Sequence, residues 1–160
     1  IHVLRKELDE LRKYKQEKEN SSCRIDDIAS LDESISLSGT YGTSHYNWEI
    51  TLSWKDLFGL ISPFFLEPHN DYFAKDIISK VLIEETGRSH AYNPEICSKD
   101  FQTIKIQMRV LGLMHIASAQ TTKGGQALFW SLSQKGIKLM NDLRVIRHSE
   151  SSESNSQIIE

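Results

Sequence analysis

The sequence predicts a small domain of the α+β class, and three observations lead to that class. Between residues 54 and 112, three successive segments have apolar side chains at helical spacing. Two alternating runs on either side of the segment TTKGG then predict a pair of strands, and a last helical pattern follows them. A further alternating pair precedes the first of these helices. Because the strands are grouped in hairpins and do not alternate singly with helices, the α+β class is favoured over α/β.

Residues 1–19 consist of helix formers and contain neither glycine nor proline. Ile1, Leu4, Leu8 and Leu11 follow the 3–4–3 spacing of a coiled-coil seam. Lysines occupy the next seam positions, so the apolar stripe ends after about two heptads. The pattern predicts a coiled-coil-like helix in which these four residues are the candidate dimer seam, and a charged linker helix is the alternative. A seam this short is not stable alone.

A polar linker is expected over residues 20–33, with an amphipathic turn at its end. The segments SISLSGTYG and YNWEITLSW then alternate between apolar and polar residues. Such runs on either side of a polar connection predict a β-hairpin with a long loop.

Ser53 and Asp56 form a capping signature in front of the first helix of the domain. Pro63 ends this helix soon afterwards. The predicted apolar face of the helix consists of Trp54, Leu57, Phe58 and Ile61. The connection that follows the helix is expected to pack inward through Phe64, Phe65 and Leu66.

The second helix is expected to end at Gly87, which can adopt the positive φ of a helix C-terminus. The third is expected to be capped by Ser98 and to end at Gly112, and the last to be capped by Ser133. The predicted buried faces of these helices are Phe73, Ile77, Val81 and Leu82 in the second, Phe101, Ile104, Met108 and Leu111 in the third, and Ile137, Met140, Leu143 and Ile146 in the last.

Two strands, MHIASAQ and QALFWSLS, are predicted around the segment TTKGG, where Gly124 and Gly125 permit a tight turn. The resulting order is three helices, a two-stranded hairpin and a C-terminal helix. This order is typical of a winged helix, here with an extra N-terminal β-hairpin and a coiled-coil-like N-terminal helix. The predicted domain covers residues 34–148, and the serine-rich segment 149–160 is expected to be a disordered tail.

Composition and spacing argue against an enzyme. The six histidines are scattered singly and the two cysteines, Cys23 and Cys97, are far apart, so no metal-ligand spacing is present. Titratable residues do not cluster around a candidate nucleophile. We therefore expect no catalytic residue, no metal and no cofactor. Two isolated thiols favour a reducing cytoplasm, and the absence of a long apolar run favours a protein that does not span the membrane.

The polar face of the predicted third helix, residues 98–112, is the candidate binding element. Its side chains can contact base edges and phosphates or a protein partner. The wing turn, residues 121–125, and the last helix add further basic side chains. The candidate DNA-binding or partner-binding residues are Gln102, Thr103, Lys105, Gln107, Arg109, Lys123, Lys135 and Lys138. The net charge of −3 is unlike that of a strong nucleic-acid binder.

The runs DFQTIKIQMRVLGLM and TTKGGQALFWSLSQKGIKLM resemble the winged-helix superfamily. LFWSLSQKG is similar to the ending of many bacterial winged helices, in which threonine usually stands where this chain has Ser133. More narrowly, WKDLFGLISPFFL, TGRS, DFQTIKIQ and WSLSQKG resemble the C-terminal region of a bacterial family. Its members carry an N-terminal domain of unknown function that is similar to nucleoside deoxyribosyltransferase or TIR-like folds. The resemblance covers about residues 34–148 and implies no catalytic residue in this chain.

These observations favour a non-enzymatic binding module that mediates assembly or regulation of a larger bacterial protein. The expected partners are a second copy, through the N-terminal helix, and an upstream domain of the same protein. That domain is expected because the chain begins with Ile1 inside a heptad pattern. The alternative is a DNA-binding winged helix that contacts the duplex through helix 98–112 and the wing turn 121–125.

Overall fold

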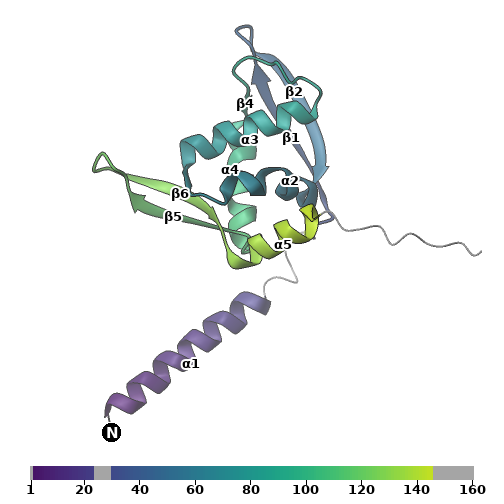
Figure 1. Ribbon diagram of the computed structural model, residues 1–160. Helices are drawn as coiled ribbons and strands as arrows, with labels where there is room; N and C mark the ends of the chain where they lie inside the picture. The colour runs from purple at the N-terminus through teal and green to yellow at the C-terminus, as the bar shows by residue number, and fades with distance from the viewer. Residues whose placement is uncertain (1, 24–29, 146–160) are drawn as a thin grey trace, which may run out of the picture.

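The structure is a computed structural model, and it describes residues 2–23 and 30–145. Within them the chain forms five α-helices and two small antiparallel sheets, which confirms the predicted α+β class (Figure 1). The helices are α1 (His2–Cys23), α2 (Trp54–Ile61), α3 (Asp71–Glu85), α4 (Ser98–Val110) and α5 (Gln134–Arg144).

Helix α1 continues beyond residue 19, to Cys23. The side chains of Leu4, Leu8 and Leu11 are respectively 66%, 53% and 65% exposed. Ile1, the first residue of the candidate seam, lies outside the described residues, as do the predicted tail and Ile146. In the single chain, therefore, the leucine stripe of α1 faces solvent.

The first sheet contains the predicted hairpin. Strands β1 (Ser34–Tyr41) and β2 (Tyr46–Ser53) pair antiparallel over their whole length, and the connecting loop is shorter than expected. A two-residue strand that the sequence did not predict, β4 (Glu95–Ile96), pairs with the other edge of β1. The resulting order is β2–β1–β4. Leu37 and Trp48 are buried on the inner face of this sheet.

The second sheet is built on the hairpin of β5 (Met114–Gln120) and β6 (Gln126–Leu132), as predicted. Strand β3 (His69–Asn70), which precedes α3, pairs with β6 and gives the order β3–β6–β5. At the hairpin turn Gly124 has a φ of +86°, a conformation that glycine adopts without strain. Gly125 has no positive φ, so only one of the two glycines is required by the turn.

Helix α2 begins as the capping signature predicts, because Ser53 Oγ accepts a 3.0 Å hydrogen bond from the N–H of Asp56. A 3₁₀ helix, η2 (Ser62–Phe65), follows it and buries Phe65. Phe64 and Leu66 are 49% and 59% exposed, so the expectation that all three apolar residues pack inward was wrong. Three residues complete one turn of a 3₁₀ helix, and consecutive side chains of such a turn cannot all face one core.

The predicted buried face of helix α3 was only partly correct, since Leu82 is fully buried as predicted but the other three residues are not. Phe73 is 54% exposed, and Ile77 and Val81 are only partly buried. The buried face consists of Ala74, Ile78, Ser79, Leu82 and Ile83. The segment from Ile77 to Ile83 is apolar over most of its circumference, so periodicity alone could not choose between adjacent faces. The end of the helix was predicted correctly, since Gly87 has a φ of +85°.

Helix α4 buries its predicted face, Phe101, Ile104 and Met108, with Leu111 just beyond its end. Its start differs from the prediction. Cys97 occupies the cap position without a side-chain hydrogen bond, and Ser98 is already helical. The pairing of β4 with β1 holds this end of the helix instead. At the start of α5, Ser133 Oγ accepts a 2.9 Å hydrogen bond from Gly136 N–H, as predicted.

The core is centred on Trp130 of β6, which is fully buried. Its ring stacks between Phe65 and Phe101, with centroid distances of 5.6 and 5.4 Å. Three segments of the chain, η2, β6 and α4, thus contribute to one aromatic stack. This stack fixes the inner face of α4 and consequently determines which of its side chains face outward.

Candidate partner-binding surface on helix α4

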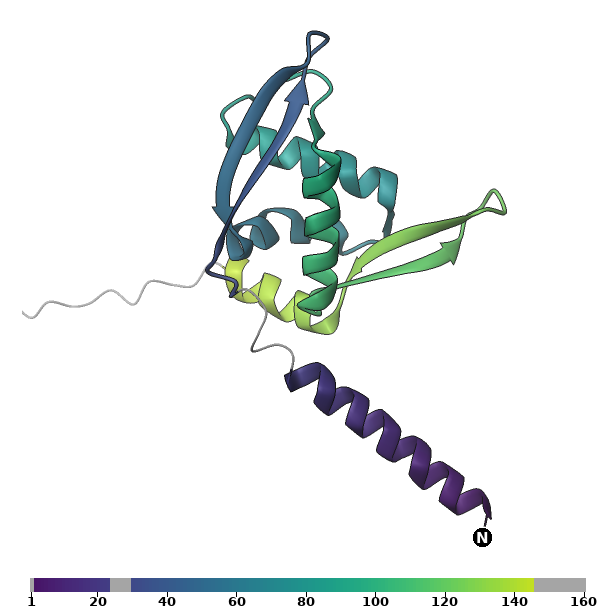
Figure 2. The same ribbon diagram turned by 180° about the vertical axis from the view of Figure 1, so that it is seen from behind.

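Helix α4 lies between the β1–β2 hairpin on one side and the β5–β6 hairpin on the other (Figure 2). Because Phe101, Ile104 and Met108 face the core, the opposite side of the helix is open to solvent. We call this side the α4 surface. It is formed by the exposed residues Lys99, Gln102, Thr103, Ile106, Arg109 and Val110.

Three of the five candidate residues predicted in α4, namely Gln102, Thr103 and Arg109, belong to this surface. Lys105 does not. Its side chain is only 13% exposed, and its Nζ lies 2.8 Å from Asp71 Oδ1 at the start of α3. The same Nζ lies 5.0 Å from the centre of the Phe101 ring. Lys105 thus joins α4 to α3 and is not available to a ligand in this arrangement.

Gln107 lies at the other margin of the α4 surface. It is only partly exposed, and its Nε2 is buried without a hydrogen-bond partner. Lys105 and Gln107 thus flank the surface on opposite sides, since they are two residues apart on a helix. A helical face contains residues three and four apart, so they could not both share the outward side with Gln102.

Two apolar side chains occupy the centre of the α4 surface, and neither was among the predicted binding residues. Ile106 is 61% exposed and Val110 is 49% exposed, and they are four residues apart on the helix. A signal for them existed: both lie off the stripe formed by Phe101, Ile104, Met108 and Leu111. Isoleucine and valine in the middle of an exposed helix face favour contact with another apolar surface.

The N-terminal turn of α4 is joined to the first sheet by hydrogen bonds. The N–H of Ser38 in β1 donates a 2.9 Å hydrogen bond to Asp100 Oδ2. The carbonyl oxygen of Ser38 accepts a 2.8 Å hydrogen bond from Cys97 N–H. Recognition helices of helix-turn-helix proteins contact bases mainly through their N-terminal residues. Here that end of the helix is bonded to the β1–β2 hairpin.

The three remaining candidate residues are lysines, and they are exposed but belong to different elements. Lys123 lies in the turn of the β5–β6 hairpin, and Lys135 and Lys138 lie on α5. Lys135 Nζ donates a 3.0 Å hydrogen bond to the carbonyl oxygen of Leu111, at the C-terminal end of α4. Such a lysine satisfies a carbonyl that has no partner within the helix. Lys135 therefore has a structural contact in addition to its charge.

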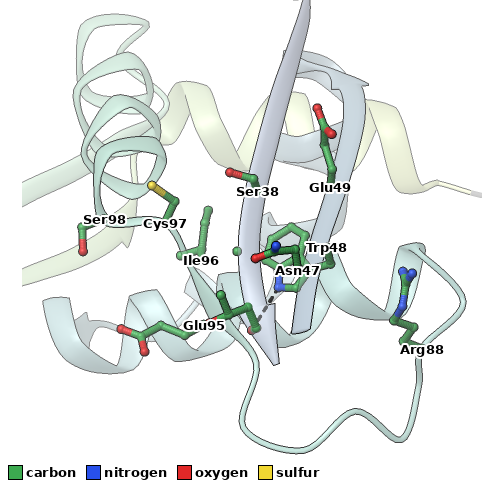
Figure 3. A pocket seen from close by; sticks show the side chains of 11 residues that line it. Ser38, Asn47, Trp48, Glu49, Arg88, Glu95, Ile96, Cys97 and Ser98 are labelled. Carbon is green, nitrogen blue, oxygen red and sulfur yellow. Dashed lines mark hydrogen bonds between the residues drawn. The ribbon is translucent and has the colours of Figure 1, made fainter. Parts of the chain in front are cut away.

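A pocket of about 840 Å³ lies over the first sheet, next to the N-terminal end of α4 (Figure 3). Its margin includes the charged groups of Glu49, Arg88 and Glu95, and these point in different directions. Glu95 is paired with Lys75 at 3.0 Å. The thiol of Cys97 is exposed at the same pocket. No common point at which these groups would bind a ligand is visible.

Among the side chains that the structure describes, no group of three or more histidine, cysteine, aspartate or glutamate residues could hold a metal ion. In residues 2–23 and 30–145, no helix combines the length and the apolar character needed to cross a membrane. No protein-family model matches the chain, and no curated protein matches it in sequence.

Proposed function

We propose that residues 34–148 form a winged-helix domain with an additional hairpin at its N-terminus. The order α2, β3, α3, β4, α4, β5, β6, α5 supports this assignment, with β6 between β3 and β5 in the second sheet. In this interpretation α4 is the third helix of the domain and the β5–β6 hairpin is its wing. The extra hairpin, through β4, adds a second sheet against α4.

The domain is, in this proposal, a non-enzymatic binding module. It contributes to assembly or regulation of a larger bacterial protein by contact between the α4 surface and another protein, and α1 contributes self-association. The observation that carries the proposal is the exposure of Ile106 and Val110 in the centre of the α4 surface. A phosphate backbone offers such side chains no apolar contact, whereas depletion of charge at the centre is typical of protein interfaces.

DNA binding is the second candidate. Lys99, Arg109 and Lys123 are exposed, and charges of this kind contact phosphates in DNA-binding domains. Two contacts count against it. Lys105 is paired with Asp71, and the N-terminal turn of α4 is bonded to Ser38. The favoured partner is therefore a protein.

The assembly proposal is tested by replacing the two apolar residues of the α4 surface. Light scattering on the complete gene product should give a smaller particle mass for the double variant Ile106→Lys, Val110→Lys than for the parent. Tyr92→Lys is the matched control, since Tyr92 is 71% exposed and lies outside the α4 surface. Circular dichroism would verify that each variant is folded. An unchanged mass in the double variant would refute a role of this surface in assembly.

The DNA alternative is tested by fluorescence anisotropy with a random duplex at about 50 mM salt, where non-specific binding is strongest. A non-specific DNA-binding domain typically has a dissociation constant between about 10⁻⁴ and 10⁻⁶ M, so it would bind the duplex at protein concentrations up to about 100 μM. We expect this chain not to bind in that range. Micromolar binding that is lost in Arg109→Ala and Lys123→Ala would overturn the preference for a protein partner. Glu84→Ala, which removes an exposed acidic residue from α3, is the control for general charge effects.

A further inference from the structure

Helix α1 presents an apolar stripe that nothing in the described chain covers. Leu4, Leu8 and Leu11 are each more than half exposed, and they recur at spacings of four and three residues. Spacings that alternate in this way place side chains on one line along a slightly underwound helix. The spacing is that of a helix that pairs with another helix of the same kind.

Charged residues border this stripe in a definite order. If Leu8 is taken as position a of the heptad, Leu4 and Leu11 are at position d. Glu7 is then at position g, and Arg5 and Arg12 are at position e. Glu7, Arg5 and Arg12 are exposed. The two margins of the seam thus carry opposite charge, acidic at g and basic at e.

We propose that α1 pairs with α1 of a second copy of this chain, in parallel and in register. The proposal rests on the self-association included in the proposed function and specifies its geometry. In a parallel pair, each residue at g faces the residue at e of the following heptad on the other helix. Glu7 of each copy therefore faces Arg12 of the other copy, which gives two attractive pairs for each dimer.

The antiparallel arrangement lacks this complementarity. There, g faces g and e faces e, so Glu7 is brought near Glu7 and Arg5 near another arginine. Like charges at these positions disfavour the arrangement. Lys15 occupies the seam position that follows Leu11 and places two ammonium groups together in a parallel pair. The seam therefore ends before Lys15, and both chains leave the pair from the same end.

Charge reversal tests the orientation. Glu7→Arg places arginine against Arg12, and Arg12→Glu places glutamate against Glu7, so each variant alone should associate roughly tenfold more weakly than the parent. Their mixture should form heterodimers as stable as the parent dimer, because every facing pair is again attractive. Sedimentation equilibrium measures the dissociation constant of each variant alone and that of the mixture. Glu10→Arg, at an outward position of α1, is the matched control and should associate like the parent.

Disulfide trapping gives a second measurement in which weak association still registers. In a background with Cys23→Ser and Cys97→Ser, Leu4→Cys and Leu11→Cys should each form a disulfide with the same residue of another copy. Lys6→Cys, on the outer side of α1, should not. If trapping occurs only when Leu4→Cys and Leu8→Cys are mixed, the helices are antiparallel and the proposal is wrong.

The outcomes also separate the orientation from the proposed function. Absence of self-association in the parent chain at every concentration would refute both the parallel pair and the role of α1 in assembly. Association that Glu7→Arg leaves unchanged would refute only the orientation, and so would weakened association that mixing with Arg12→Glu does not restore. The role of the α4 surface is decided independently, by the Ile106→Lys, Val110→Lys variant.

Discussion

The indole Nε1 of Trp130 donates a 2.9 Å hydrogen bond to Oδ1 of Asp71, 59 residues earlier in the chain. The same carboxylate forms the ion pair with Lys105. One acidic side chain at the start of α3 therefore connects β6, at the centre of the core, with α4. It satisfies a donor on a fully buried ring and also neutralises a lysine with only 13% of its side chain exposed.

Removal of this carboxylate should destabilise the domain. Asp71→Ala leaves the Trp130 N–H and the Lys105 ammonium without their acceptor, so we expect a loss of roughly 1–3 kcal/mol in the free energy of unfolding. Urea denaturation followed by tryptophan fluorescence measures it. Asp76→Ala is the control: it removes an exposed pair with Lys80 four residues away, at a cost of at most about 0.5 kcal/mol. Equal losses in the two variants would contradict the structural role of Asp71.

The orientation of α4 is tested at two adjacent residues. Leu111 is 7% exposed and Val110 is 49% exposed. Leu111→Ala should lower the free energy of unfolding by roughly 2–5 kcal/mol, the usual cost of truncating a buried leucine. Val110→Ala should change it by no more than about 0.5 kcal/mol. If the two losses were reversed, the α4 surface would face the core.

Two glycines should respond to alanine with opposite signs. A Cβ on Gly136 would overlap the carbonyl oxygen of Leu113, a backbone atom that cannot move aside alone. Gly136→Ala should therefore destabilise the domain by roughly 1–3 kcal/mol. A Cβ on Gly59, within α2, would lie 3.8 Å from Leu143 Cδ1, which is an ordinary contact. Gly59→Ala should stabilise by roughly 0.4–1 kcal/mol. Thermal unfolding monitored by circular dichroism would reveal both signs.

The attachment of the first sheet to α4 is tested at Asp100. Its carboxylate accepts hydrogen bonds from both the N–H and the Oγ of Ser38, and it lies in the first turn of α4, where negative charge is favourable. Asp100→Ala should cost roughly 1–2 kcal/mol, whereas Asp142→Ala, at an exposed position of α5, should be nearly neutral. Faster amide hydrogen exchange at Ser38 in Asp100→Ala would locate the effect. Unchanged exchange at Ser38 would contradict the role of Asp100 in attaching the first sheet to α4.

Local signals in the sequence were sufficient for many features of the fold. Ser53 and Ser133 cap their helices as predicted because a cap depends on residues only three positions apart. Gly87 and Gly112 end their helices with positive φ for a similarly local reason. The two hairpins were also predictable, since the strands of each are neighbours in the sequence.

Features that depend on distant partners were not predictable. Strands β3 and β4 have two residues each, too few to show alternation, and they exist because β6 and β1 lie beside them. The candidate surface shows the same limit. The sequence pattern indicated an unpaired lysine at position 105, on a polar helix face. Its environment is instead set by Asp71, 34 residues earlier. Ile106 could have been noticed from its position off the buried stripe.

The pairing of β4 with β1 has a consequence for how far the domain can be shortened. Strand β4 lies in the segment that leads into α4, and its partner lies in the hairpin that precedes α2. A protein that began at Trp54 would keep all three central helices, yet it would lack the Ser38 carbonyl that accepts a hydrogen bond from Cys97 N–H. It would also uncover the side chain of Ile96, which is now 1% exposed. The smallest autonomously folding unit therefore includes the β1–β2 hairpin, and a limited-proteolysis fragment that lacked the hairpin would not persist as a folded species.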